Sequence, residues 1–300
     1  MIRQNCIDSK HHKINPEIES INEEIEEKFA LAFTEFIKKL EESVFPQTFY
    51  KLFIWATDDF KSKPGLAYSF YHLCTVLAVQ LKSTFVVTVA VQMISNIKEV
   101  LTYYSEYRVL NKKKNVLQIL GKVLKLINTV SVYDRREFVK THLFDACGEI
   151  LIDLIGKTTN IGFGDGDKFV KNDLSPTISS MCLALSVSSG SGAVLENMPM
   201  VGGETKNKNN EVDDSLSWKN VHYKILQKTR DTRASVRKAS VQIIYDIALK
   251  IGGDYTLLMP EAVPFFAELL EDDSEDVELF TKKCLQGMEV AIGENIQQYF

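Results

Sequence analysis

The last third of the chain, from Trp218 to Phe300, carries the same helical pattern twice, and this repetition limits the fold more than any other feature. Each copy has an outgoing helix, a turn that contains an aspartate, and a return helix that begins with valine five residues after that aspartate. The two aspartates, Asp231 and Asp272, are 41 residues apart, as are Val236 and Val277. The pattern predicts two helix pairs that lie side by side.

The apolar residues of the return helices explain why such pairs must stack. They recur every three or four positions and therefore share one face of each helix. In the first copy they are Val236, Ala239, Ile243, Ile247 and Ile251, and in the second Val277, Phe280, Cys284, Met288 and Ile292. A single helix cannot hide such a stripe, but stacking against the next pair can. We therefore expect an all-α fold, an α-solenoid of HEAT-like antiparallel helix pairs.

Two further positions fit the HEAT pattern in one copy and depart from it in the other. Arg237 follows Val236 as in the HEAT Val-Arg pair, whereas the second copy has Glu278 there, which leaves an Asp–Arg ladder in that copy in doubt. Pro264 lies eight residues before Asp272, where HEAT repeats commonly carry a proline. The residues expected to define the repeats are Asp231, Val236, Arg237, Pro264, Asp272 and Val277.

The rest of the chain is expected to be mostly helical. We expect a poorly ordered lead at residues 1–16, a HEAT-like helical region at 17–187, a disordered insertion rich in Gly, Ser and Asn at 188–214, and the two repeats at 215–300. The first helix has an apolar stripe that includes Ile18, Ile21, Ile25, Phe29 and Phe33. Gly156–Asp173 is expected to be a flexible connector.

Charge is unevenly distributed along the chain. The formal net charge is −5, which does not favour nucleic-acid binding by the chain as a whole. One basic patch lies mid-chain, at Lys112–Lys114, Lys122, Lys125, Arg135, Arg136 and Lys140. A second, in the first repeat, gives the candidate contacts to RNA or a protein partner: Lys219, Lys224, Lys228, Arg230, Arg233 and Lys238. Solvated surface and an internal Asp–Arg brace remain open as alternatives.

Several function classes are disfavoured. The five cysteines form no CxxC pair, which favours buried, reduced thiols in an intracellular protein. The N-terminus is too polar for a signal peptide, and the longest apolar run, Phe85–Met93, is interrupted by polar residues, so no membrane contact is expected.

No catalytic or cofactor motif is recognisable either. The histidines are scattered, with no Ser-His-Asp order, HExxH or P-loop, so we expect no enzyme, no cofactor and no small-molecule substrate. His11 and His12 could bind a metal, but solvated side chains are the preferred interpretation. Asp165 and Asp167 resemble a calcium loop only weakly.

Four segments resemble the C-terminal domain of the large HEAT-repeat protein of the small-subunit processome, a family associated with the U-three small nucleolar RNA. They are Phe49–Ala56, Ile225–Asp231, Leu258–Asp272 and Ile292–Phe300. The resemblance covers most of the chain from about Phe29 and is weaker in the middle. Because family members are far longer, it also implies that this chain is their last part, a fragment or an incomplete gene model.

The resemblance implies a nuclear, nucleolar scaffold without catalytic residues. It would act in early processing of the ribosomal RNA precursor, and in some members also in transcription of ribosomal DNA. Its partners would be processome proteins, the small nucleolar ribonucleoprotein and, as a further candidate, pre-ribosomal RNA. The alternative, based on the repeats alone, is a HEAT adaptor of another complex, such as a nuclear-transport or phosphatase scaffold.

Overall fold

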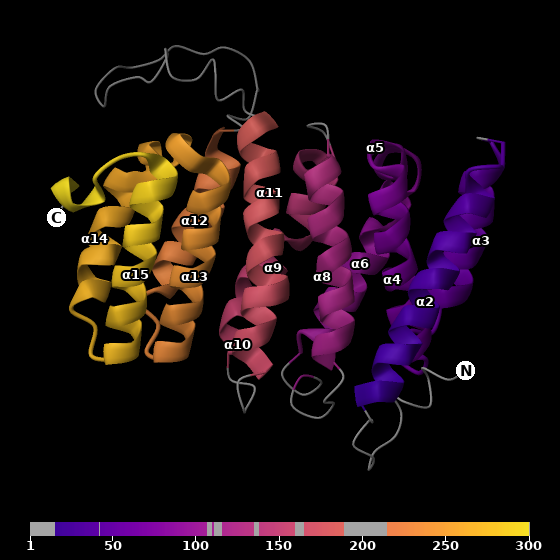
Figure 1. The fold of residues 1–300 in the computed structure, drawn as a ribbon, viewed down its shortest axis with the longest axis horizontal. Coiled ribbons are helices and arrows are strands. Elements are labelled where there is room, and N and C mark those ends of the chain that lie inside the picture. Colours follow the sequence, from indigo (N-terminus) through magenta and orange to yellow (C-terminus); the bar gives the residue numbers. More distant parts are fainter. Residues whose placement is uncertain are drawn as a thin grey trace. The chain divides into compact units, whose positions relative to one another are not determined.

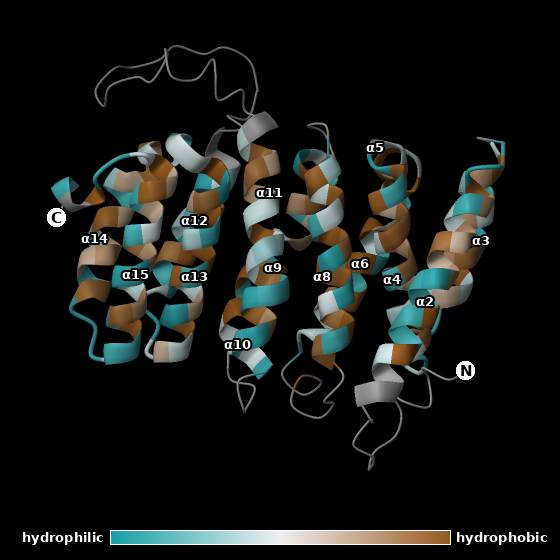
Figure 2. Cartoon of the chain, in the orientation of Figure 1, coloured by the Kyte–Doolittle hydropathy of each residue, from teal (hydrophilic) through white to brown (hydrophobic). Residues whose placement is uncertain are grey.

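A computed structural model describes residues 16–41, 43–106, 110, 116–134, 138–159, 165–188 and 215–299. All regular elements in these ranges are helical, and none is a strand, which confirms the all-α prediction (Figure 1). The chain divides into two compact units, residues 1–150 and 151–300. Hydrophobic and hydrophilic residues alternate along the helices of both units, as expected for amphipathic helices (Figure 2).

The first unit is built around one central helix. Its elements are α2 (Pro16–Ile37), α3 (Val44–Thr57), α4 (Pro64–Leu81), α5 (Ser83–Phe85), η1 (Val86–Ala90), α6 (Val91–Tyr104), α8 (Val116–Tyr133), η2 (Val139–Leu143) and the start of α9 (Phe144–Thr158). Helix α4 packs against both α2 and α8 and buries Tyr71, Cys74 and Leu77 completely. The apolar stripe of α2, in contrast, lies on the exposed side of that helix.

The second unit contains the two predicted helix pairs. Its elements are the end of α9, α10 (Asp165–Phe169), η3 (Val170–Leu174), α11 (Ser175–Ser188), α12 (Ser215–Lys228), α13 (Ala234–Ile251), η4 (Gly252–Leu258), α14 (Met259–Leu270), α15 (Glu275–Ile292) and η5 (Ile296–Tyr299). Helix α12 pairs with α13 and α14 with α15, while α13 also packs against α11 and α15. The predicted pairs are therefore confirmed.

The return helices bury most of their predicted stripes. Ile243, Ile247 and Met288 are fully buried, whereas Phe280 is only partly buried and does not fill the seam between the pairs. Both return helices end at a glycine with positive φ, Gly252 at 65° and Gly293 at 79°. A left-handed residue after the last helical turn is most easily supplied by glycine, and here it recurs at the repeat offset.

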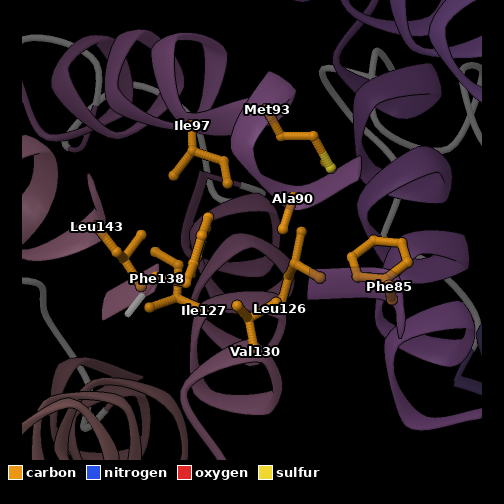
Figure 3. Close-up of a pocket in the computed structure, with 9 residues that line it drawn as sticks. All are labelled: Phe85, Ala90, Met93, Ile97, Leu126, Ile127, Val130, Phe138 and Leu143. Atoms are coloured by element: carbon orange, nitrogen blue, oxygen red, sulfur yellow. The ribbon is translucent and has the colours of Figure 1, made fainter. Parts of the chain in front are cut away.

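Three π-helical turns each begin at the valine of a Phe-Val pair, and this pair occurs three times in the chain. Phe85, Phe138 and Phe169 are each buried and each stand immediately before η1, η2 or η3. Phe85 and Phe138 line one small apolar cavity together with residues of α6 and α8 (Figure 3). Its volume, about 10 Å³, is at the lower limit for a single water molecule, so it is a packing defect and not a ligand site.

One expectation from the sequence is corrected. Residues 165–173 are helical, in α10 and η3, because Phe169 and Val170 are buried; a flexible connector over Gly156–Asp173 is therefore wrong there, and residues 160–164 lie outside the described ranges. Ser83–Tyr104 and Val116–Tyr133 are long and apolar enough to cross a membrane by length and composition, although the apolar run Phe85–Met93 is short and interrupted by polar residues. About half of each segment is buried against other helices (44% and 56%), as in the core helices of a globular unit.

Free, buried thiols occur at Cys74, Cys147, Cys182 and Cys284, as predicted. Burial raises the pKa of the last three to about 12, which keeps them protonated and unreactive at neutral pH. The lead up to residue 15 and the insertion at 189–214 lie outside the described residues, so the domain boundaries proposed there stay predictions.

Candidate functional site

A single guanidinium, that of Arg237, connects the turns of the two C-terminal repeats. Its Nε and Nη2 atoms donate to the two carboxylate oxygens of Asp272, at 2.7 and 2.6 Å. Its Nη1 atom donates to the backbone oxygens of Asp231, at 3.0 Å, and Thr232, at 3.2 Å. Arg237 stands at the start of α13 next to the buried Val236, so the apolar seam fixes the direction in which its side chain leaves the helix.

The pair formed by Arg237 and Asp272 is nearly enclosed. The two side chains are only 10% and 6% exposed, and the hydrogen bonds from Arg237 are the largest cause of the lowered pKa of Asp272. Arg237 also contacts Asp273, whose side chain is exposed. An ion pair with two parallel hydrogen bonds has a fixed geometry, so it holds the two turns in one register.

The two repeat aspartates organise their turns in the same way. Asp231 Oδ1 accepts a hydrogen bond from the backbone N–H of Arg233 at 2.9 Å, and Asp272 Oδ1 accepts one from Ser274 at 2.8 Å. In both turns the aspartate therefore binds the backbone two residues later, just before the return helix begins. This shared role explains why an aspartate stands five residues before both Val236 and Val277, which are both buried.

The carboxylate of Asp231 is held by Arg233 and not by an arginine of another repeat. Arg233 donates to Asp231 from Nε at 2.9 Å and from Nη2 at 3.0 Å, and its Nη1 donates to the backbone oxygen of Gly156, at the end of α9, at 2.9 Å. These bonds are the main cause of the lowered pKa of Asp231. In the second copy Glu278, which replaces the repeat arginine, pairs with Lys282 along α15.

The other predicted basic contacts are mostly engaged by carboxylates of the same unit. Arg230 makes two hydrogen bonds to Glu268, at 2.7 and 2.6 Å, and its guanidinium lies 4.2 Å from the ring centre of Phe265. Lys238 pairs with Asp276 at 2.6 Å. Lys228 lies 4.0 Å from Asp153. Lys219 and Lys224 are partly buried on α12. The patch is therefore largely neutralised within the second unit.

Pro264 lies inside α14, which continues through it, and its side chain is exposed. Of the mid-chain patch, Lys112–Lys114, Arg135 and Arg136 lie outside the described residues. Lys122 is only 12% exposed and lies 3.8 Å from Glu23, with its ammonium 4.9 Å from the ring centre of Tyr68. It is therefore an internal contact of the first unit and not part of an exposed basic surface.

One buried polar pair was not singled out from the sequence. His222 on α12 is fully buried, with Nε2 2.8 Å from the hydroxyl of Tyr255 and Nδ1 3.8 Å from a carboxylate oxygen of Glu261. Burial lowers the pKa of His222, which favours the neutral ring at pH 7. The contacts of His222 join α12 to η4 and α14.

No group of three potential metal ligands among His, Cys, Asp and Glu is present within the described ranges. Asp165 and Asp167 lie on the short helix α10 and not in a loop. His11 and His12 lie outside these ranges.

Comparison with known proteins gives consistent matches. The model of the BP28CT (NUC211) domain matches residues 2–139. HEAT repeat-containing protein 1 of Homo sapiens is 28% identical over 273 residues, covering 88% of this chain and 11% of that protein. The Danio rerio protein of the same name is 29% identical over 286 residues, covering 88% of this chain and 12% of that protein.

A further relative carries a more informative name. U3 small nucleolar RNA-associated protein 10 of Schizosaccharomyces pombe is 30% identical over 87 residues, covering 28% of this chain and 5% of that protein. The chain thus spans only about a ninth of the length of its human relative. The chain thus carries a BP28CT domain and has homologues named HEAT repeat-containing protein 1 and U3 small nucleolar RNA-associated protein 10.

Proposed function

We propose that this chain is a non-catalytic scaffold segment of the small-subunit processome, acting in the nucleolus in early processing of the ribosomal RNA precursor. The observation that carries the proposal is its homology to a protein named for association with the U3 small nucleolar RNA. Ribosomal DNA transcription is a further role within the same proposal. Its partners would be processome proteins and the U3 ribonucleoprotein.

The described geometry supports a scaffold more than a catalyst. Helix pairs whose turns are tied by Arg237 and Asp272 form a stiff support, and stiffness lowers the entropy that is lost when a partner binds. The strongly shifted groups, such as His222 and the thiols, lie inside the packing and are not gathered in an open cleft. Such repeats present side chains to protein partners along their outer helices.

The assignment can be tested by locating the tagged chain and recovering what it binds. We expect it to coincide with a nucleolar marker and to co-purify the U3 RNA together with processome proteins. A chain that stays in the cytoplasm and recovers neither would contradict the proposal. Recovery of nuclear-transport receptors or a phosphatase instead would favour the alternative, a HEAT adaptor of another complex.

Direct RNA binding by the patch from Lys219 to Lys238 is the weaker part of the proposal, because most of its cations pair with carboxylates. We expect Lys224→Glu/Lys228→Glu to leave RNA recovery unchanged and protein partners to carry the association. Arg233 is left out of this test because it holds Asp231 and Gly156. A loss of RNA in this variant, with protein partners retained, would establish the patch as an RNA contact.

A further inference from the structure

Helix α2 presents its apolar stripe to solvent. Phe29 is 65% exposed, Ile25 57%, Ile21 55% and Phe36 54%. The opposite face, with Ala30, Thr34 and Ile37, is the buried one. The exposed residues recur every four or seven positions, so they form one continuous row along the helix. The rings of Phe29 and Phe33 stack along this row, with centroids 6.3 Å apart.

Polar contacts fix this orientation. The hydroxyl of Tyr68 donates to Glu23 at 3.1 Å, and that of Ser69 donates to Glu26 at 2.6 Å. Lys122 of α8 lies 3.8 Å from Glu23. Rolling α2 to bury its apolar row would break these contacts and expose Ala30 and Ile37 instead. The row is therefore held outward by the contacts between α2 and the rest of the first unit.

Exposed large hydrophobic side chains are also frequent elsewhere on α2 and on α3. Half of the large hydrophobic residues that are exposed in the described ranges lie between residues 21 and 55. Besides the row on α2 they are Leu31, Val44, Tyr50, Ile54 and Trp55. Among the described elements, α2 packs substantially against α4 alone, whereas α4 is covered by α2 on one side and α8 on the other. A continuous exposed apolar row such as that of α2 marks a surface that another element covers.

We propose that the apolar row of α2, from Ile21 to Phe36, is a repeat seam that binds a HEAT-type helix pair, one that lies N-terminal to the matched region in the longer relatives. Those relatives are named for HEAT repeats, and this chain spans only 11–12% of the human and zebrafish proteins. In a stack of this kind each pair is covered by its neighbours on both sides. This inference does not depend on the processome assignment.

The charges on α2 describe the partner further. Glu24 already pairs with Lys28 at 2.6 Å, and Glu27 lies on the side of Leu31, away from the row, so the docking helix is specified by its apolar stripe and not by basic residues. The charged residues of α2 are mostly acidic, which disfavours an anionic membrane surface as the occupant, since helices that bind such surfaces carry Lys and Arg on their polar face.

The test uses the full 300-residue chain and, as probe, the segment of roughly two repeats, about 90 residues, that immediately precedes the matched region in the zebrafish relative. We expect a one-to-one complex in analytical ultracentrifugation and slower amide exchange across α2 when the probe is added. Ile25→Asp/Phe29→Asp should weaken binding at least tenfold. It should leave the melting temperature within about 2 °C of the wild type, because both side chains are exposed.

Leu279→Asp, at a residue of α15 that is 57% exposed, serves as the matched control and should bind the probe as the wild type does. The proposal is overturned if the wild type does not bind the probe, or if the α2 variant binds it equally well. It is also overturned if the wild-type chain alone forms a dimer that Ile25→Asp/Phe29→Asp dissolves, since the occupant would then be a second copy of the chain.

Discussion

Helices α2 and α13 are both amphipathic, and each packs against a neighbouring helix, but they turn opposite faces inward. Helix α13 buries its apolar row, with Val236, Ile243 and Ile247 inaccessible to solvent. Helix α2 exposes Ile25 and Phe29 and meets α4 and α8 partly through carboxylates. In one case the apolar stripe holds the unit together, and in the other it is left for a further contact.

The difference arises from the neighbours and not from the helices themselves. Helix α13 lies between α11 and α15, so an apolar face has a covering surface available. Helix α2 meets Tyr68, Ser69 and Lys122, whose polar atoms need partners when they are covered. An amphipathic pattern thus predicts a helix and a stripe, but it does not say which face the fold buries.

The largest expected effect is on the brace between the repeats. Arg237→Ala leaves the nearly enclosed carboxylate of Asp272 without its main partner and should lower the free energy of unfolding by about 3–5 kcal/mol. Lys122→Met, the matched change beside α2, should cost about 1 kcal/mol or less, because Glu23 is half exposed and remains solvated. Urea denaturation of both variants measures the difference. Equal losses would mean that the two contacts are energetically alike.

Truncation of single apolar side chains shows which residues fill the seam between α13 and α15. Ile243→Ala should cost on the order of 2–5 kcal/mol because the side chain is fully buried and a cavity remains. Phe280→Ala should cost about 1 kcal/mol, since that ring is only partly buried and lies under the ammonium of Lys238, 5.3 Å from its centre. A larger loss for Phe280→Ala would show that the seam is drawn in the wrong place.

Acidification should destabilise both units through His222, which is fully buried, and His72, which is partly buried. Burial lowers the pKa of His222 and of His72, so the unfolded chain binds the proton more tightly than the folded one. The free energy of unfolding is therefore highest above the unfolded histidine pKa of about 6.5, and it decreases as the pH falls below that value. The melting temperature should therefore decrease from pH 7 towards pH 5. The carboxylates of Asp231 and Asp272 are still ionised in this range because their pKa values are lowered.

Replacement of the two histidines identifies which one dominates. His222→Gln should flatten the decline more than His72→Gln does, because His222 is the more deeply buried ring. Calorimetric scans of the three proteins at pH 7, 6 and 5 provide the measurement. An unchanged slope in both variants would assign the pH dependence to other groups.

The smallest effect is expected on the outward row of α2. Phe29→Ala should change the free energy of unfolding by less than about 0.5 kcal/mol, in contrast to Ile243→Ala, because the ring already contacts water. Ile37→Ala, on the buried side of the same helix, is the internal control and should cost about 2 kcal/mol or more. A large loss for Phe29→Ala would mean that the row is covered within the chain.

The C-terminal pairs could be predicted well because their signals are local. Valine after an aspartate turn, apolar spacing and the repeat offset located α13 and α15 to within two residues. The π-helical turns could have been suspected only from the recurring pairs at Phe85, Phe138 and Phe169. The helix at Asp165–Phe169 was missed because its glycines and aspartates resemble a loop, whereas burial of Phe169 decides the outcome.

The sequence identified the residues of the candidate site but not all of the partners that they bind. Arg237 and Asp272 were recognisable as repeat residues, and the doubt about Glu278 was reasonable because that side chain bonds within its own helix. An internal Asp–Arg brace was one of the alternatives left open by the sequence, and it holds for Arg233 with Asp231, but the partners of Arg230 and Lys238 could not be identified from the sequence. For Arg230 and Lys238 the partner lies 38 residues away and is brought close only by the stacking of the pairs.

By itself the sequence determined that the described chain is helical, that its last part repeats, and which residues form the repeat turns, because these depend on spacing within a few residues. Only the tertiary structure decided which cations are neutralised and that α2 turns its apolar row outward. Both depend on what each helix face meets, and the sequence contains no local record of that.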